Sequence, residues 1–505
     1  FGSSLAQGPS GQSGVFSAIA MMSSRSTTSS SRGVIVVAAA GAAAATASVL
    51  SRTFAHVGQS VGTGTSIRAA AFRGLRGSSA EAPPGGYVFE ATSQPSLQLA
   101  LGAFAGLAAA AISSGAARRR RSGTAPRRSA PVTAMRAGTL ADCPYTVYGK
   151  KDIDVSTERQ NMQEITCPLE VEMPAELAGN LDAQRAYFAE NLPKIYKDLK
   201  KHGAVVFRGF ELSKESAGFT QVGEALELER CEDPLHSVAA RDAVNKEAGV
   251  YEAVNKPSRR KFYVGMHNEM VGNRAPGAAL FVCFKAAEEG GEFLVADGRK
   301  MFKDLDEDWL KTVYDKEVRY STAEFPMGFL ESLGPLQGAV EPLAYGALQQ
   351  ALKMKVDFDT ELVWEKSEYD GSKILQVRAM PQVPIVRHPY TGEPAWWGSM
   401  HSHAEYLRSE REKVYGEEGF AETTGASRIN KTDVYYADTD EKLEVDRLKH
   451  LDDVTMKAAV PVKMKEGDMV LLDNYLVMHG RCPFEGTRKH AVTWFKSPDY
   501  SKAEA

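Results

Sequence analysis

The feature that most constrains the fold is a series of short segments, rich in β-branched and aromatic residues, spread between residues 204 and 495. GAVVFRGF, AALFVCFKAA, GEFLVAD, DMVLLDN and HAVTWF are examples. Turn sequences separate several of them, among them PYTGEP at 389–394 and KEGD at 465–468. Many short strands with few helices predict a mainly β (α+β) protein with a sandwich or barrel core.

Helical segments are expected at the start of this region and as inserts within it. Residues 181–203 carry apolar side chains at helical spacing, and His202–Gly203 ends the pattern. Further helices are predicted at 304–316, 405–416 and 440–459. The last three strand-like segments, DMVLLDN, YLVMHGR and HAVTWF, follow closely on one another, which favours a β-meander at the C-terminal end.

The N-terminal part of the chain differs from the rest in charge. Residues 1–141 contain thirteen arginines, no lysine and two acidic residues, a net charge of +11. Because the whole chain of 505 residues carries −4, the remainder carries −15. This difference in charge indicates that the basic N-terminal leader and the acidic remainder are separate parts of the protein. The acidic body argues against nucleic acid as a partner, since phosphate binding needs a basic surface.

The leader has the composition of a targeting segment. Apolar runs at 34–50 and 97–112 are short for transmembrane helices, and four arginines at 118–121 follow the second run. Arg, Ser and Ala richness without acids is typical of transit peptides. The order of parts resembles leaders that carry proteins into complex plastids. We therefore predict a leader at 1–137, disordered or removed, and a stromal mature domain at 138–505 with no stable membrane span. A low-complexity tail or a retained anchor is the alternative.

The five cysteines indicate neither a disulfide framework nor a zinc site. They are scattered and never closely paired, and Cys283, inside the apolar run AALFVCF, is expected to be core.

A metal-ligand pattern occurs in GMHNEM, residues 265–270. Residues i and i+2 of a strand face the same side, so His267 and Glu269 can point together into a barrel. A third ligand must come from a distant strand, and His479 in YLVMHGR is the best candidate. Two imidazoles and one carboxylate on one face of an octahedral ion leave three adjacent positions open, as in non-haem Fe(II) oxygenases. The alternative is three unrelated polar residues.

Arg488 completes this pattern if the co-substrate is 2-oxoglutarate. The keto acid fills two of the open positions and dioxygen the third, and the distal carboxylate then needs a cation further in. Arg488, nine residues beyond His479, supplies a guanidinium that can bind a carboxylate with two hydrogen bonds. An iron enzyme that uses no keto acid is a weaker reading, because it leaves Arg488 without a purpose.

A rival cluster lies in MHSHAEY, where His401, His403 and Glu405 are expected on one strand face. The Gly-rich lead-in of cupin metal motifs is missing there, so we predict pocket or surface roles rather than metal ligation. His388, in RHPYTGE, is expected to stabilise a turn. Asp473 and Asn474, just before the strand of the third ligand, are expected to support the site or the turn.

The sequence here resembles the taurine dioxygenase-like (TauD/TfdA) Fe(II)/2-oxoglutarate dioxygenases, and within them the clavaminate synthase-like and amino-acid β-hydroxylase-like branch. The matching stretches GAVVFRGF, MHNEM, GGE, HPYTGEPAWW and GDMVLLDNYLVMHGRCPFEGTRK occur in family order over residues 180–496. The resemblance implies a double-stranded β-helix core (jelly-roll, cupin-like). It also implies iron on His267, Glu269 and His479, and 2-oxoglutarate on Arg488.

One position departs from the family pattern. Members of this branch usually read G-G-E-T or G-G-D-T, and the Thr hydroxyl also binds 2-oxoglutarate; here the residue is Phe293. Losing a neutral hydrogen bond costs about 1 kcal/mol, which weakens the co-substrate without forbidding it. Alternatively, the pocket is reshaped or the co-substrate differs.

Two hypotheses about function follow. The first is a plastid dioxygenase that hydroxylates or desaturates a small organic substrate, such as an amino acid or another small carboxylate or sulfonate. The plastid address adds a pigment precursor, whose porphyrin propionate would become an acrylate as chlorophyll c formation requires. The second, motivated by Phe293, is a non-catalytic binding or regulatory protein that retains the dioxygenase fold.

Overall fold

The computed structural model describes residues 140, 151–253, 255, 260, 263–272, 274–368, 370–415 and 432–504. These residues all belong to one compact unit. The predicted leader, 1–137, lies outside the described residues. Within the part of the chain that the structure describes, no helix combines the length and apolarity that crossing a membrane requires.

The larger of two central sheets has the strand order β1-β2-β17-β7-β20-β5-β4, with β3 paired to β20. Its strands are β1 (Leu169–Glu172), β2 (Ala204–Arg208), β3 (Arg230–Cys231), β4 (Ala243–Asn245), β5 (Val250–Glu252), β7 (Ala278–Lys285), β17 (Met469–Asp473) and β20 (Lys489–Phe495). The β1–β2 pair is parallel, and the other pairs are antiparallel. The sheet thus joins strands from both ends of the described chain.

The smaller central sheet has the order β16-β9-β18-β6, antiparallel throughout. Its strands are β6 (Val264–His267), β9 (Phe293–Asp297), β16 (Val460–Val462) and β18 (Val477–Arg481). One hydrophobic core contains side chains of both sheets, including Phe281, Val470 and Trp494 from the larger and Val295 and Val477 from the smaller. Burying each such side chain contributes about 1.5–3 kcal/mol, so the two sheets pack on each other.

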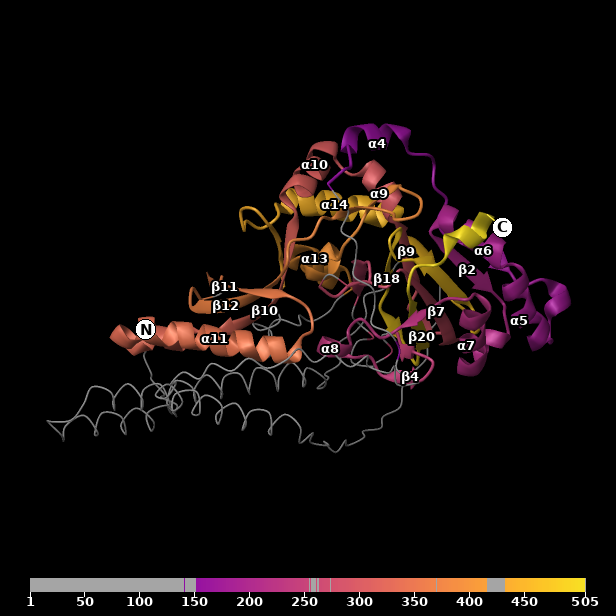
Figure 1. Ribbon diagram of the computed structural model, residues 1–505, viewed down its shortest axis with the longest axis horizontal. Coiled ribbons are helices and arrows are strands. Elements are labelled where there is room, and N and C mark those ends of the chain that lie inside the picture. Colours follow the sequence, from indigo (N-terminus) through magenta and orange to yellow (C-terminus); the bar gives the residue numbers. More distant parts are fainter. Residues whose placement is uncertain are drawn as a thin grey trace, which may run out of the picture. The chain divides into compact units, whose positions relative to one another are not determined.

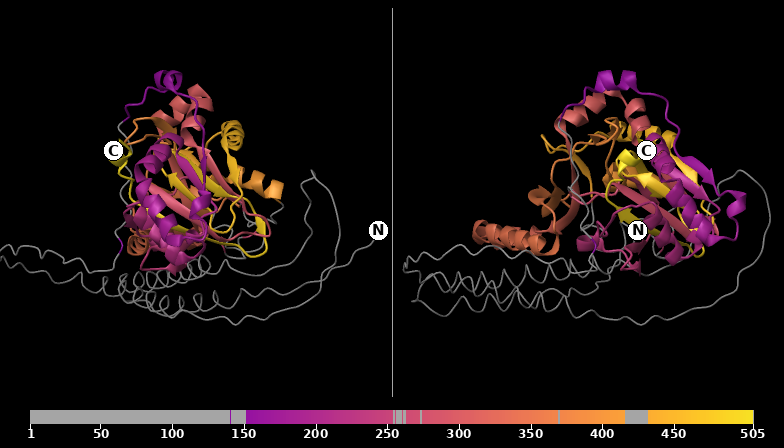
Figure 2. Two further views of the ribbon diagram at one scale, coloured as in Figure 1. Left: turned by 90° about the vertical axis from the view of Figure 1, so that its right-hand side faces the viewer. Right: turned by 45° about the vertical axis from the view of Figure 1, so that its right-hand side comes forward.

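Helices cover the outer faces of both sheets (Figures 1 and 2). The larger sheet packs against α5 (Leu181–Glu190), α6 (Leu192–His202) and α7 (Ser216–Ala225). The smaller sheet packs against α9 (Gly298–Asp304), α10 (Glu307–Lys316) and α14 (Val445–Ala458). The single helix predicted at 181–203 is two helices, α5 and α6, separated at Asn191. The second helix is capped by Gly203, whose φ of 69° suits a residue without Cβ.

A third sheet, β11-β12-β10-β15, lies beside these layers. It consists of β10 (Val318–Pro326), β11 (Thr360–Lys366), β12 (Lys373–Ala379) and β15 (Val434–Tyr436). Between β10 and β11 the chain forms η4 (Gly328–Leu336) and α11 (Gln337–Lys355), the long helix at the lower left of Figure 1. Helix α11 was not predicted from the sequence. Only a narrow stripe of its surface is buried, so its sequence lacks the broad apolar face by which an amphipathic helix is recognised.

The remaining elements are short, apart from α13. They are α4 (Val155–Asn161), η1 (Ala175–Leu177), η2 (Leu212–Lys214), α8 (His236–Ala239), β8 (Glu289–Gly290), β13 (Ile385–Arg387), β14 (Pro394–Trp396), α12 (Met400–His403), α13 (Glu405–Tyr415), β19 (Phe484–Glu485) and η5 (Tyr500–Glu504). The fold is mixed α+β, as predicted, with helices at all three expected inserts.

Two local predictions were wrong. The last long strands form no meander, because β17 and β20 flank β7 in the larger sheet while β18 belongs to the smaller one. Every residue of β17 and β18 is buried, so both faces of each strand are covered and proximity in sequence does not decide the pairing. The segment MHSHAEY is also not a strand, since His401 and His403 lie on the short helix α12.

Candidate metal centre

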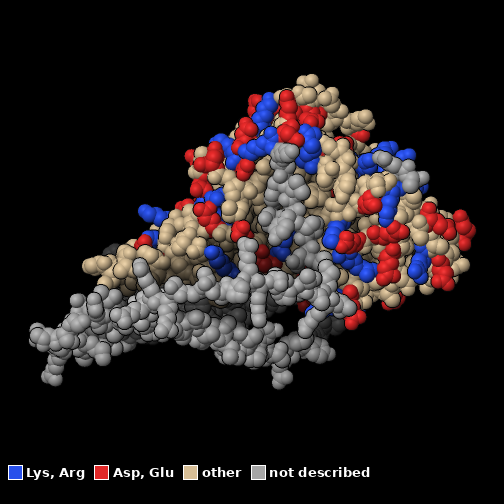
Figure 3. Space-filling model, viewed as in Figure 1, with Lys and Arg blue, Asp and Glu red and all other residues tan. Residues whose placement is uncertain are grey.

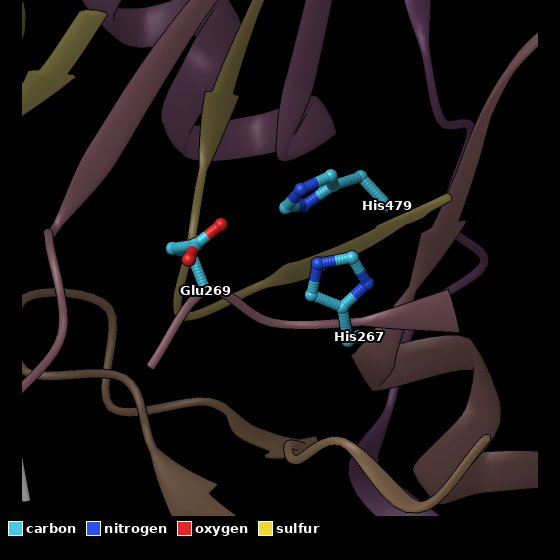
Figure 4. A group of neighbouring side chains, drawn as sticks. All are labelled: His267, Glu269 and His479. Atoms are coloured by element: carbon cyan, nitrogen blue, oxygen red, sulfur yellow. The ribbon is translucent and has the colours of Figure 1, made fainter. Parts of the chain in front are cut away.

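The structure brings together the three predicted ligands. Strand β18 lies between β9 and β6, and His479 and His267 are direct register partners across the β18–β6 pair. Glu269 lies two residues further along, just past the end of β6. Ligand atoms of all three side chains lie within 4.8 Å of one another, and Figure 4 shows them converging on one space.

Asn474 holds Glu269 in place through its backbone. Its side-chain oxygen accepts a hydrogen bond from the Glu269 amide at 2.9 Å, and its Nδ2 donates to the Glu269 carbonyl at 2.9 Å. Asn268, the spacer of the H-x-E pattern, donates to the Asn474 carbonyl at 2.8 Å and accepts from the Gly398 amide at 2.9 Å. The expected supporting role of Asn474 is confirmed, whereas that of Asn268 was not foreseen.

The hydrogen bonding and the burial of the two imidazoles suit metal ligands. His267 Nδ1 donates to the Gly265 carbonyl at 2.7 Å, so Nε2 is the ring nitrogen left to bind a metal ion. Burial, reinforced by the charges of His267 and Arg241, lowers the pKa of His479 well below its ordinary value. The His479 ring is therefore neutral, as a ligand must be.

Aromatic side chains surround His479. The ring of Phe293 stacks on it at 5.9 Å between centroids and 11° between planes, and Phe281 lies at 5.0 Å and Trp494 at 6.4 Å. Phe293, where the family pattern has Thr, is thus part of the wall behind a candidate ligand. Its ring excludes water from one side of the site and offers no hydrogen bond to a co-substrate.

Arg241 is a site residue that the sequence analysis missed. Its Nη2 donates to both carboxylate oxygens of Glu269, at 3.0 and 2.8 Å, and its Nη1 pairs with Asp233. Burial alone would lower the pKa of Arg241, but Glu269 and Asp233 together hold it above its ordinary value. The surrounding sequence, AARDAV, carries no motif that could have pointed to it.

These residues fit a divalent metal ion. Two imidazoles and one carboxylate are a donor set that suits Fe(II) and similar ions. Among the described residues, the buried Nδ1 of His479 has no hydrogen-bond partner, so one polar atom of the site remains unsatisfied. An unsatisfied buried polar atom is costly, which is expected where a ligand completes the site.

Arg488, the predicted cation for the co-substrate, is also buried, with 4% exposure. Its Nη1 donates to the Ala253 carbonyl at 2.8 Å, while its Nε has no partner among the described residues. Burial, and then the nearby charge of Arg481, lowers the pKa of Arg488 to about 9. The guanidinium is still cationic at neutral pH, and within the described chain no acidic side chain pairs with it.

The Gly-Gly sequence of GGE lies against this arginine. Gly291 has a φ of +74°, and a Cβ at that position would stand 3.0 Å from Phe484 Cβ and 3.5 Å from Arg488 Cδ. A larger residue would be strained in this conformation, so glycine lets the chain approach Phe484 and Arg488 closely. A buried cation of this kind fits a carboxylate such as the distal group of 2-oxoglutarate.

The rival histidines do not join the metal cluster. His401 and His403 pack beside β6, and burial lowers the pKa of His401 to about 3 and that of His403 to about 4. His388 accepts at Nδ1 from the Thr391 amide at 2.9 Å and donates at Nε2 to Asp473 at 3.0 Å. The expected turn-stabilising role of His388 is confirmed.

Comparisons with known proteins identify the family. The profile of the family described as "Taurine catabolism dioxygenase TauD, TfdA family" matches residues 168–494. The dapdiamide synthesis protein DdaC of Enterobacter agglomerans is 25% identical over 336 residues, which cover 65% of this chain and 92% of that protein.

The solved structures that align with this chain share little sequence with it. One is an asparagine oxygenase in complex with Fe(II), 2S,3S-3-hydroxyasparagine and succinate, with 13% identity and a TM-score of 0.38 over 65% of this chain and 94% of that one. Another is a taurine dioxygenase from Burkholderia xenovorans, with 12% identity and a TM-score of 0.35 over 66% and 88%.

The family match covers well over half of the chain and defines its class, an oxidoreductase of the 2-oxoglutarate-dependent, non-haem iron dioxygenases. The chain belongs to the TauD, TfdA family. Its co-substrates and metal are accordingly 2-oxoglutarate, dioxygen and Fe(II).

Proposed function

We propose that this dioxygenase holds Fe(II) on His267, Glu269 and His479, and binds 2-oxoglutarate at Arg488, in order to hydroxylate or desaturate a small organic molecule. The observation that carries the proposal is the convergence of the three ligand atoms within 4.8 Å. The packing of the two central sheets, of which the smaller carries His267 and His479, also supports the double-stranded β-helix core that the family resemblance implies.

The residues of this chain bind, orient and exclude water. When bound, the metal, the keto acid and dioxygen together supply the oxidising chemistry. His267 and His479 offer neutral nitrogen donors, and Asn474 fixes the backbone of Glu269 so that its carboxylate stays beside them. Arg488 holds the distal carboxylate of the keto acid by charge-assisted hydrogen bonds, which sets the orientation of the co-substrate.

The visible face of the described residues favours a small-molecule substrate over a nucleic acid. On the face shown in Figure 3, acidic and basic side chains are interspersed over the described residues. Binding of a phosphate backbone requires a basic stripe or patch. The substrate that we propose is an amino acid, another small carboxylate or sulfonate, or a pigment precursor of the chlorophyll c type.

The experiment that tests the metal and co-substrate assignment is an anaerobic titration of Fe(II) and 2-oxoglutarate into the protein. A weak visible charge-transfer band is expected when the keto acid chelates the iron, and the substitutions H267A and R488A should each weaken it. Iron binding without the band would mean that the site beside Phe293 binds a co-substrate other than 2-oxoglutarate. The non-catalytic alternative predicts no succinate formation when dioxygen and candidate substrates are then added to the protein loaded with iron and 2-oxoglutarate.

The plastid location and the pigment substrate are separate proposals. They rest on the composition of residues 1–137 and on the reaction type. A fusion of residues 1–137 to a fluorescent protein should reach the plastid stroma, and a fusion that remains in the cytosol would refute the address. Incubation of the enzyme with iron, 2-oxoglutarate and protochlorophyllide-type substrates should yield an acrylate side chain; no such product would exclude this substrate class.

A further inference from the structure

Three charged side chains, two of them buried and one partly buried, lead from the candidate metal centre to the loop before β4. Glu269 is 3% exposed and Asp233 is 2% exposed, and Arg241 lies between them. The Arg241 amide also donates to Asp233 Oδ2 at 2.8 Å, and its guanidinium lies 5.0 Å from the centre of the Trp494 ring. Arg241 is therefore held at four points next to a carboxylate that a metal ion would use.

The position of Arg241 sets up a competition. One nitrogen, Nη2, donates to both oxygens of Glu269, so neither oxygen is free of the arginine. A divalent metal on the side of His267 and His479 needs a lone pair from at least one of these oxygens. Two positive charges that share one carboxylate repel each other strongly in a site of low dielectric constant.

Asp233 is a second hydrogen-bond acceptor for Arg241, besides Glu269. It already accepts from both the backbone amide and Nη1 of Arg241, so the guanidinium keeps a buried acidic partner when Glu269 turns toward a metal. The other end of the loop is anchored as well, because Asp357 accepts from Ser237 Oγ at 2.6 Å and pairs with His236 Nε2 at 3.1 Å. Arg241 thus stays near the site in either state.

We infer that Arg241 is a positioning residue that competes with the divalent metal for Glu269, lowers the metal affinity of the site, and is drawn away from Glu269 by Asp233. The inference rests on the proposed function in one respect, namely that Glu269 is a metal ligand. It predicts opposite changes in metal affinity when Arg241 and Asp233 are replaced one at a time. If the two residues only kept Glu269 in place, both replacements would weaken metal binding.

The test is an anaerobic titration of the full chain with Co(II), followed by the visible absorption of the bound ion. R241Q removes the competing cation and should tighten Co(II) binding by about tenfold, within the range of effects that residues behind metal ligands usually have. D233N keeps an acceptor oxygen but removes the charge that draws Arg241 away, so it should weaken binding by about tenfold. R319Q, at an arginine that pairs with Glu361 in the third sheet, is the matched control and should leave the affinity unchanged.

The outcomes separate this inference from the proposed function. Weaker binding in both R241Q and D233N would show that Arg241 is a scaffold, and unchanged binding in either variant would also overturn the inference. If the R241Q chain does not fold, the neutral, unbranched R241M takes its place with the same expectation. If the unmodified chain binds no Co(II), or if H267A binds it equally well, the metal centre itself has been wrongly assigned.

Discussion

The two ends of the candidate site treat their charges in opposite ways. At the metal end, the acidic ligand Glu269 is already neutralised by Arg241, which Asp233 holds from behind. At the co-substrate end, the buried Arg488 has no acidic partner within the described chain, and the charge of Arg481 lowers its pKa further. The candidate ligand Glu269 thus has a cationic partner, whereas Arg488 has no acidic partner among the described residues. A metal ion on Glu269 would therefore compete with Arg241, whereas a carboxylate at Arg488 would meet a cation that no acidic side chain neutralises.

The largest expected effect comes from removing a metal ligand. H479A deletes one of three donors that converge within 4.8 Å, and it should lower Co(II) or Fe(II) affinity by more than about a hundredfold, beyond the usual effect of residues behind the ligands. Anaerobic metal titration measures this loss. H202Q, at the end of α6, is the control. Metal binding by H479A as tight as in the unmodified protein would remove β18 from the site.

The next largest effect concerns the co-substrate end. R488Q removes a charge-assisted pair of hydrogen bonds, each of which contributes about 1.5 kcal/mol or more, so 2-oxoglutarate should bind about a hundredfold more weakly. Titration of the charge-transfer band gives this dissociation constant. Metal affinity should not change, which is the distinction between the two ends. R488K keeps the positive charge but lacks the planar guanidinium, so its affinity for 2-oxoglutarate should lie between those of R488Q and the unmodified protein. A change in metal affinity as large as that in keto-acid affinity would break the comparison.

A smaller effect is expected at Asn474, which supports the metal end. N474A removes both hydrogen bonds to the backbone of Glu269 and leaves a buried amide unsatisfied, so unfolding should cost about 2 kcal/mol less free energy. Metal affinity should fall by about tenfold as Glu269 loses its fixed place. Denaturant unfolding and metal titration measure the two effects. The control is N161A in α4, an exposed asparagine that should change neither.

The smallest effect on binding is expected at Phe293. F293T restores the hydroxyl of the family pattern next to the co-substrate pocket, and one neutral hydrogen bond of about 1 kcal/mol should tighten 2-oxoglutarate by about fivefold. The same change removes a ring that stacks on His479, so the free energy of unfolding should fall by about 3 kcal/mol. The charge-transfer titration and a denaturation curve measure these opposite effects. Unchanged keto-acid affinity would show that this position does not face the co-substrate.

Much of the site was visible in the sequence because strand geometry and ligand chemistry leave few choices. The i, i+2 spacing of His267 and Glu269 predicted a shared direction, and the structure places both beside His479. Glu269 lies past the end of its strand, so hydrogen bonds from Asn474 hold it where strand pairing does not. The turn role of His388 was also foreseen, since a histidine before PYTGE has backbone amides within reach.

Other features could not be predicted, because they depend on contacts between distant segments. The pairing of β17 and β20 with β7, rather than with their neighbour in sequence, follows from both faces of each strand being buried. The helical state of MHSHAEY is set by its packing beside β6, where the His401 carbonyl approaches Gly265 so closely that a Cβ would be 2.7 Å away.

By itself, the sequence predicted the class of the protein, its candidate metal ligands and a candidate cation for the keto acid. Those depend on residue type and short spacing, which chain-local geometry fixes. Only the tertiary structure decided that β18 pairs with both β6 and β9, that Phe293 lies against His479, and that Arg241 holds the Glu269 carboxylate. The physical reason is that burial and charge pairing between remote segments are settled when the sheets pack, and no pattern along the chain encodes them locally.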